Sequence, residues 1–183
     1  KVESLDFSSK SLRVEDAIII AEFLKVNASL KSINLLKNEI GDEGFEAIKI
    51  AFEGNENLKS VCGIKEDETE KDLSGKYLEP VDGKLLALDL KFNASLKEID
   101  LHSNEIGNEG AKAIAEALKV NASLKNIDLR NNNFGSTGWI EIFNGIKENE
   151  NCKLEEINLY DEKIGIEDLY HFCQRFCTFH LPH

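Results

Sequence analysis

Polar side chains recur at two fixed positions of a repeated pattern in this sequence of 183 residues. Counted from the start of each copy, with position 68 as the start of the third, the fifth residue is Asp or Asn, whereas the seventh varies in chemistry. If both positions lie on the exposed side of adjacent strands, they form two rows with neighbours about 4.8 Å apart. The first row is Asp6, Asn34, Asp72, Asp100, Asp128 and Asn158, and the second is Ser8, Leu36, Ser74, His102, Arg130 and Tyr160.

The first row poses a problem of charge, because like charges opposite each other on neighbouring strands repel. Bound cations, basic residues of a partner, or His102 and Arg130 within the chain could compensate it. Alternatively, Asp and Asn only suit a solvated strand face and the start of a turn. The chemical variety of the second row favours a surface that recognises a partner, since Tyr and Arg are frequent interface anchors. The predicted contact residues are Asn34, Leu36, Glu98, Asp100, His102, Asn126, Asp128, Arg130, Glu156, Asn158, Tyr160 and Asp161.

A repeat of about 28 residues must position these rows. Near-copies begin at Leu30, Leu96, Leu124 and Leu154, and a more divergent copy begins at Val2. Each copy opens with apolar residues at its first, fourth and sixth positions, of which the last two alternate as in a short strand. Apolar residues at i, i+3 and i+7 then indicate one face of a helix. These helix positions include Ala17, Ile20, Leu24, Phe45, Ile48, Phe52, Ala111, Ile114, Leu118, Trp139, Ile142 and Ile146.

One strand and one helix cannot bury both apolar faces, so the copies are predicted to stack as a solenoid. Its parallel strands should form one sheet, with Leu30, Leu96 and Leu124 at equivalent points and the helices outside. Neighbouring helices need about 8 to 10 Å and neighbouring strands only about 4.8 Å. We therefore expect an arc with the sheet on its concave side. Trp139 shares its position with Phe45 and Ala111, which predicts a core residue.

The consensus L-x-x-I-x-L-x-x-N-x-I-G-x-E-G, followed by A-x-x-I-A-x-A-L-x-x-N-x-S-L, resembles the ribonuclease-inhibitor class of leucine-rich repeats. That class also supplies the sensor ends of NOD-like receptors. The resemblance implies a right-handed α/β horseshoe, a single domain over 1–183 with units starting near 2, 30, 58, 96, 124 and 154. In the family, Asn at the ninth position satisfies the backbone of the turn, and Asn38, Asn104 and Asn132 match it. Lys10, Lys76 and Glu162 depart from this Asn, which predicts looser turns or turns served by water.

Two irregular regions interrupt or end the pattern. The spacing between Leu58 and Leu96 is longer than the regular repeat, which predicts an insertion loop over about 63–72 with an exposed tip near 64–70. Strand candidates at 58–63 and 70–73 compete there, because adjacent parallel strands need a long crossover between them. The loop is either a tolerated insertion or a contact for a partner. At the other end, residues 167–179 are predicted to form a capping helix. Cys173 and Cys177 suit that cap better than a zinc site.

One further residue type recurs where each helix should end. These residues are Asn27, Asn55, Asn93, Asn121 and Asn149, and Asn tolerates the left-handed backbone of a helix terminus.

The composition narrows the function. A net charge of −12 and the scarcity of clustered Lys and Arg argue against nucleic-acid binding. No segment is long and apolar enough to predict a membrane span, and the cysteine spacing suits a reducing, cytoplasmic setting. The sequence lacks recognisable catalytic, cofactor and metal motifs. It therefore predicts a non-catalytic scaffold whose concave face binds a protein with a basic or neutral surface, in an oligomeric state that the sequence leaves open. The family resemblance also allows a Ran-type GTPase-activating protein acting through Arg130 or Asn131, or a sensor fragment of a larger NOD-like receptor.

Overall fold

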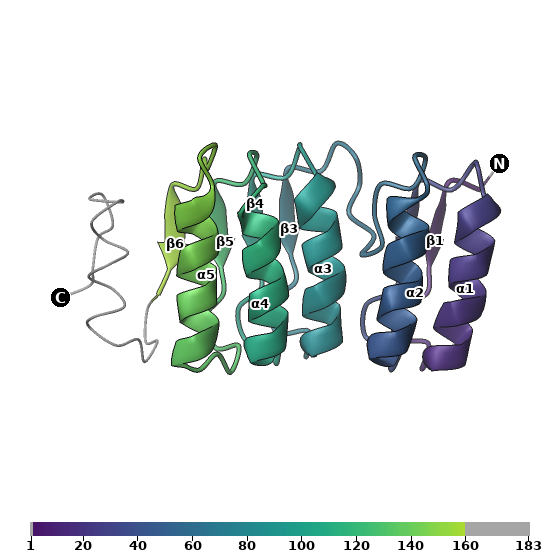
Figure 1. Ribbon diagram of the computed structural model, residues 1–183, viewed down its shortest axis with the longest axis horizontal. Helices are drawn as coiled ribbons and strands as arrows, with labels where there is room; N and C mark the ends of the chain where they lie inside the picture. The colour runs from purple at the N-terminus through teal and green to yellow at the C-terminus, as the bar shows by residue number, and fades with distance from the viewer. Residues whose placement is uncertain (1, 160–183) are drawn as a thin grey trace.

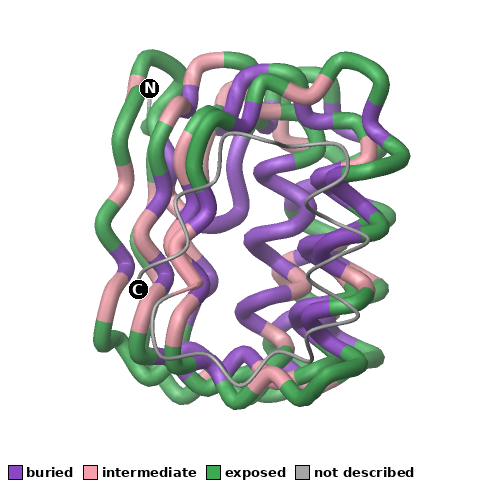
Figure 2. The backbone as a smooth tube through the Cα atoms, turned by 90° about the vertical axis from the view of Figure 1, so that its left-hand side faces the viewer, coloured by how far each residue is buried: buried purple, intermediate pink, exposed green. Residues whose placement is uncertain are grey.

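The computed structural model describes residues 2–159, which form a two-layered solenoid of alternating strands and helices (Figure 1). Seen from its end, the strands lie along one side and the helices along the other, with buried residues facing each other between the layers (Figure 2). In this part of the chain the strands are β1 (Ser4–Asp6), β2 (Ser32–Asn34), β3 (Glu70–Asp72), β4 (Glu98–Asp100), β5 (Asn126–Asp128) and β6 (Glu156–Asn158). The helices are α1 (Val14–Val26), α2 (Gly41–Glu53), α3 (Pro80–Phe92), α4 (Gly107–Leu118) and α5 (Ser136–Glu148).

The core forms where the periodicity of the sequence places it. In the copy that begins at Leu96, the strand residue Ile99 and the helix residue Ile114 are both buried. Trp139 is 1% exposed and packs against Phe134 and Phe143, which confirms its prediction as a core residue. Ile20 is the exception among the predicted helix positions, because it is only partly buried on the first helix of the stack. The alternation of strand and helix is thus confirmed.

The predicted single sheet is instead interrupted. The strands β1 and β2 form one parallel pair, and β3 to β6 form a separate parallel sheet of four strands. Ser60 bridges Ser32 of β2, and Cys62 bridges Asn34. Residues 58–64 therefore extend the first pair without a helix of their own. Figure 1 shows this connection in the gap between α2 and α3.

The insertion loop predicted over 63–72 is wrong at its C-terminal end, and its predicted exposed tip of 64–70 is wrong at Ile64. Residues 70–72 are β3, and Ile64 is 2% exposed. The rest of the predicted tip is exposed at residues 65–67 and 69–70, and half-buried at Glu68. Both strand candidates are used, because each pairs with a different neighbour and neither has to pair with the other. The predicted capping helix at 167–179, with Cys173 and Cys177, lies outside the described residues.

The asparagines that recur at the helix ends do not adopt the predicted left-handed backbone. Asn27, Asn93 and Asn149 have φ between −81° and −75° with extended ψ. The side chains of Asn55, Asn121 and Asn149 instead donate hydrogen bonds to carbonyls of the preceding repeat, whereas those of Asn27 and Asn93 accept from backbone N–H groups two and three residues further along the chain. The amide of Asn149, for example, donates to the carbonyls of Leu118 (2.7 Å) and Asn121 (2.6 Å) in the preceding repeat. Such an Asn fastens one repeat to the next.

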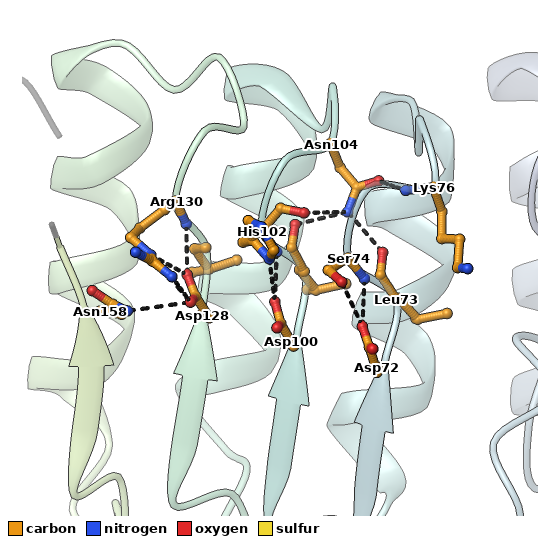
Figure 3. Close-up of polar contacts among 12 residues, drawn as sticks. Asp72, Leu73, Ser74, Lys76, Asp100, His102, Asn104, Asp128, Arg130 and Asn158 are labelled. Carbon is orange, nitrogen blue, oxygen red and sulfur yellow. Dashed lines mark hydrogen bonds and ion pairs between the residues drawn. The ribbon is translucent and has the colours of Figure 1, made fainter. Parts of the chain in front are cut away.

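The ninth-position asparagines also act across repeats. Asn38 accepts hydrogen bonds from the backbone N–H groups of Lys10 and Leu12, both at 3.0 Å. Asn104 does the same for Lys76 and Leu78 (Figure 3). We predicted that the turns at Lys10 and Lys76 would be looser or hydrogen-bonded to water. That prediction was wrong, because the Asn of the following repeat accepts hydrogen bonds from the backbone N–H groups of these turns. Glu162 lies outside the described residues.

Candidate functional site

The candidate site is the side of β3–β6 that points away from the helices, which we call the sheet face. Strand pairing is in register: Asp72 stands opposite Asp100, Asp100 opposite Asp128, and Asp128 opposite Asn158. The buried residues one position earlier, such as Ile99 and Ile127, force these side chains onto the exposed side. Figure 3 shows the row of carboxylates at the ends of the strands.

The aspartates of this row also accept hydrogen bonds from backbone N–H groups two residues further along the chain. The Oδ1 atom of Asp100 accepts a hydrogen bond from the N–H of His102 at 2.9 Å, and Asp128 accepts from the N–H of Arg130 at 3.1 Å. Asp72 accepts from both the N–H and the hydroxyl of Ser74. These turns end each strand, so the interpretation of Asp and Asn as turn-starting residues is correct.

The charge of the row is compensated in part from within the chain. The guanidinium of Arg130 binds Asp128 in a fork, with Nε to Oδ1 at 3.0 Å and Nη2 to Oδ2 at 2.7 Å. His102 Nδ1 lies 3.1 Å from Asp100 Oδ1. Hydrogen bonds from the Ser74 hydroxyl and N–H lower the pKa of Asp72 below its ordinary value. Asp72 is thus held in its charged form.

The side chains of Asp100, His102 and Asp128 lie close enough together to hold a metal ion, with possible ligand atoms within 4.8 Å of one another. However, both oxygens of Asp128 are already engaged by Arg130, and Asn158 Nδ2 lies 3.3 Å from Oδ2. A cation at this point would have to displace or repel the guanidinium.

Below the row, the sheet face forms a shallow groove of about 480 Å³ across the four strands. The third positions of the strands supply a second acidic line, in which Glu98 accepts a hydrogen bond from Asn126 Nδ2 at 3.1 Å. The groove is strongly acidic, since its one lining ammonium, that of Lys71, pairs with Glu68 at 3.1 Å. The charged lining residues are Glu70, Lys71, Asp72, Glu98, Asp100, Asp128 and Glu156.

The structure brings together most, but not all, of the predicted contact residues. Glu98, Asp100, Asn126, Asp128, Glu156 and Asn158 line the groove. His102 and Arg130 stand at its rim through their bonds to the aspartates. Tyr160 and Asp161 lie outside the described residues.

Two predicted residues belong elsewhere. Leu36 is 3% exposed and part of the core, so its prediction as a contact residue was wrong. Asn34 sits on β2, beyond the interruption of the sheet, where the inserted segment lies against it through Gly63. The extra chain at 58–64 covers this end of the first pair, and a single-sheet prediction could not foresee it.

Sequence reasoning omitted Glu70 and Lys71 from the candidate site. They were missed because the segment 58–63 competed for the third strand. The usable signal was the sequence spacing between Glu70 and Glu98, which equals the regular repeat and matches their pairing in the sheet.

Among the described residues, no helix is long and apolar enough to cross a membrane.

Comparison with known proteins agrees with this architecture. A family model described as a leucine-rich repeat matches residues 26–49, 92–115 and 120–143. Each matched segment contains a strand and the beginning of the helix that follows it. No curated protein matches the chain. Repeats of this kind generally mediate interactions between proteins.

Proposed function

We propose that this leucine-rich-repeat protein is a non-catalytic binding module, and that its sheet face holds a protein partner through a basic surface of that partner. One observation carries the proposal: the in-register pairing of β3–β6 gathers six carboxylates into a single groove with one ammonium group. A basic surface would relieve the repulsion between these carboxylates, which water and salt screen only in part.

The rim of the groove adds directed contacts to this charge. The fork between Arg130 and Asp128 fixes a guanidinium plane, and the bond to Asp100 fixes the ring of His102. Both side chains are partly buried, so they are ordered before a partner arrives. Ordered side chains lose less conformational freedom on binding, which favours affinity and specificity.

The repeat length and consensus support a finer assignment to the ribonuclease-inhibitor class. The paired strand positions keep the same sequence spacing from β3 to β4 and from β4 to β5. We regard the two family alternatives, a Ran-type GTPase-activating protein and a NOD-like receptor fragment, as outcomes that the experiments below can distinguish.

The test is affinity capture from a native lysate, followed by titration calorimetry with the captured partner. We expect Glu98→Lys together with Glu156→Lys to weaken binding at least tenfold, or about 1.4 kcal/mol. The matched control is Glu43→Lys with Glu150→Lys, which makes the same charge change at exposed residues away from the groove. Higher salt should weaken the wild-type complex.

Equal binding by the groove variant and its control would overturn the proposal for the sheet face. Added to small GTPases, the chain should leave GTP hydrolysis unchanged. Acceleration that disappears in Arg130→Ala would favour the GTPase-activating alternative. Identification of the captured partner as a component of a receptor assembly would favour the receptor fragment.

A further inference from the structure

The interruption of the repeat opens a cleft where the helices end, away from the carboxylate row at the strand ends. Residues 58–64 add a strand-like segment to the inner layer but no helix to the outer layer. The helices α2 and α3 therefore stand farther apart than the other neighbouring helices (Figure 1). We call the resulting hollow the seam cleft. It has a volume of about 620 Å³ and is lined by residues within 52–59 and 92–95, together with Ile64 and Glu66.

The floor of the seam cleft is apolar. Phe52, Leu58 and Ile64 form part of the core, and none of them is more than 5% exposed. Phe92, at the end of α3, is 55% exposed and has its ring centroid 5.8 Å from that of Phe52. The volume of the cleft falls within the range of pockets that hold a small ligand, which leaves ample room for one large side chain.

The rim of the seam cleft is negatively charged. Its lining includes Glu53, Glu56 and Glu66 but a single basic residue, Lys59. The ammonium of Lys59 donates to the backbone carbonyl of Glu56 at 2.6 Å. Lys91 lies 3.5 Å from Glu53 and offsets one of the three carboxylates. The rim therefore keeps an excess of negative charge.

The C-terminal end of α2 adds to this potential. Both α2 and α3 end in the lining of the cleft, at Glu53 and Phe92. The C-terminal end of a helix carries a partial negative charge, which basic residues in the last turn usually balance. The last turn of α2 contains no basic residue, whereas that of α3 contains Lys91. The cleft thus combines an apolar floor with a rim that attracts cations.

From this combination we infer that the seam cleft is a second binding site, which accepts a segment of a protein partner with a large apolar residue flanked by Lys or Arg. The apolar residue occupies the floor, and the basic residues face Glu56 and Glu66. The site arises from the insertion and uses no residue of the sheet face. It therefore stands independently of the function proposed for that face.

The test uses three short synthetic peptides and the ¹⁵N-labelled chain. The first has one Trp flanked on each side by two Lys, the second has Glu in place of Lys, and the third has Ala in place of Trp. Resonance changes in NMR spectra locate binding residue by residue. We expect the first peptide to perturb the amides of 52–59, Ile64, Glu66 and 92–95, and the other two to bind at least tenfold more weakly.

Because the first peptide is basic, the experiment is repeated on Glu98→Lys with Glu156→Lys. Perturbation of the seam cleft should persist in that variant. Glu56→Lys with Glu66→Lys changes two exposed residues and should weaken the peptide at the cleft about tenfold, whereas the control Glu43→Lys with Glu150→Lys should leave its affinity unchanged. Perturbations confined to the sheet face, or equal affinity for the Lys and Glu peptides, would overturn the inference.

Discussion

The hydroxyl of Ser60 donates a hydrogen bond of 2.6 Å to the carboxylate of Asp89, which lies on α3 and is completely buried. The same carboxylate accepts from the backbone N–H groups of Val61 (2.8 Å) and Cys62 (3.2 Å). One side chain of α3 thus satisfies three donors of the inserted segment. Asp82 makes a similar link, accepting from the N–H of Lys37 at 2.7 Å. These two aspartates connect α3 to the segments on the N-terminal side of the interruption, where the two sheets do not pair with each other.

Replacement of Asp89 by Ala should lower the free energy of unfolding by about 3 kcal/mol, because it leaves buried backbone donors without acceptors. Urea denaturation followed by circular dichroism measures this change. Asp67→Ala removes a carboxylate from the exposed loop and should have little effect. Similar stability for the two variants would show that the hydrogen bonds of Asp89 to the inserted segment do not stabilise the fold.

The stability of the chain should also depend on pH through Asp89. Burial raises its pKa from 3.8 to about 6, against the opposing effect of its hydrogen bonds. Between these two values the folded state binds more protons than the unfolded state. This group therefore contributes stability that is complete below about pH 4 and is lost as the pH rises to about 6 and above.

The measurement is the difference in unfolding free energy between the wild type and Asp89→Asn, which cannot titrate. Between pH 4 and pH 7, the unfolding free energy of the wild type should fall relative to that of Asp89→Asn by up to about 3 kcal/mol. Using the difference removes the parallel effect of Asp82, whose pKa burial also raises, and the opposite effect of Asp6 and Asp72, whose pKa is lowered. A flat difference curve would contradict the prediction.

The hydrogen bonds that the asparagines at the helix ends make to the preceding repeat should be essential for stability. Asn121 donates to the carbonyl of Leu90 at 2.6 Å and accepts from the N–H groups of Ser123 and Leu124. Asn121→Ala breaks these bonds in a buried setting, and we expect a loss of about 2 kcal/mol in thermal or urea unfolding. Asn144→Ala, on the exposed side of α5, is the matched control. A neutral result at position 121 would mean that the backbone finds other partners.

Two glycines should differ in their response to Ala. A Cβ atom at Gly145 of α5 would lie 2.3 Å from the carbonyl oxygen of Ala115 on α4, so Gly145→Ala must push the two helices apart. Gly75 has φ of +60° but open space around it, so Gly75→Ala meets only backbone strain. We expect losses of about 3 kcal/mol and about 1 kcal/mol, respectively, in unfolding free energy. The reverse order would contradict the close packing of α4 and α5.

The sequence was sufficient for the regular part of the fold, because each repeat encodes its own strand and helix by local periodicity. Ile99, Ile114 and Trp139 are buried where that periodicity puts them, and Asp100 and Asp128 face outward for the same reason. The row of carboxylates on β4 and β5 follows from the constant length of the repeat. Such features depend on neighbours along the chain and on the stacking of similar units.

Only the tertiary structure decided what happens at the irregular unit. Leu36 faces the core, Glu70 joins the groove, and Asp89 is buried beside Ser60, because residues 58–64 pair with β2 while β3 pairs with β4. The segment 58–64 and the strand β3 both have the local sequence pattern of a strand, so that pattern does not decide which neighbour each one pairs with. The choice between them depends on contacts between the inserted segment and α3, which are far apart in the sequence, and on the space that a missing helix leaves beside them. The repeat pattern of the sequence specifies neither these long-range contacts nor that space.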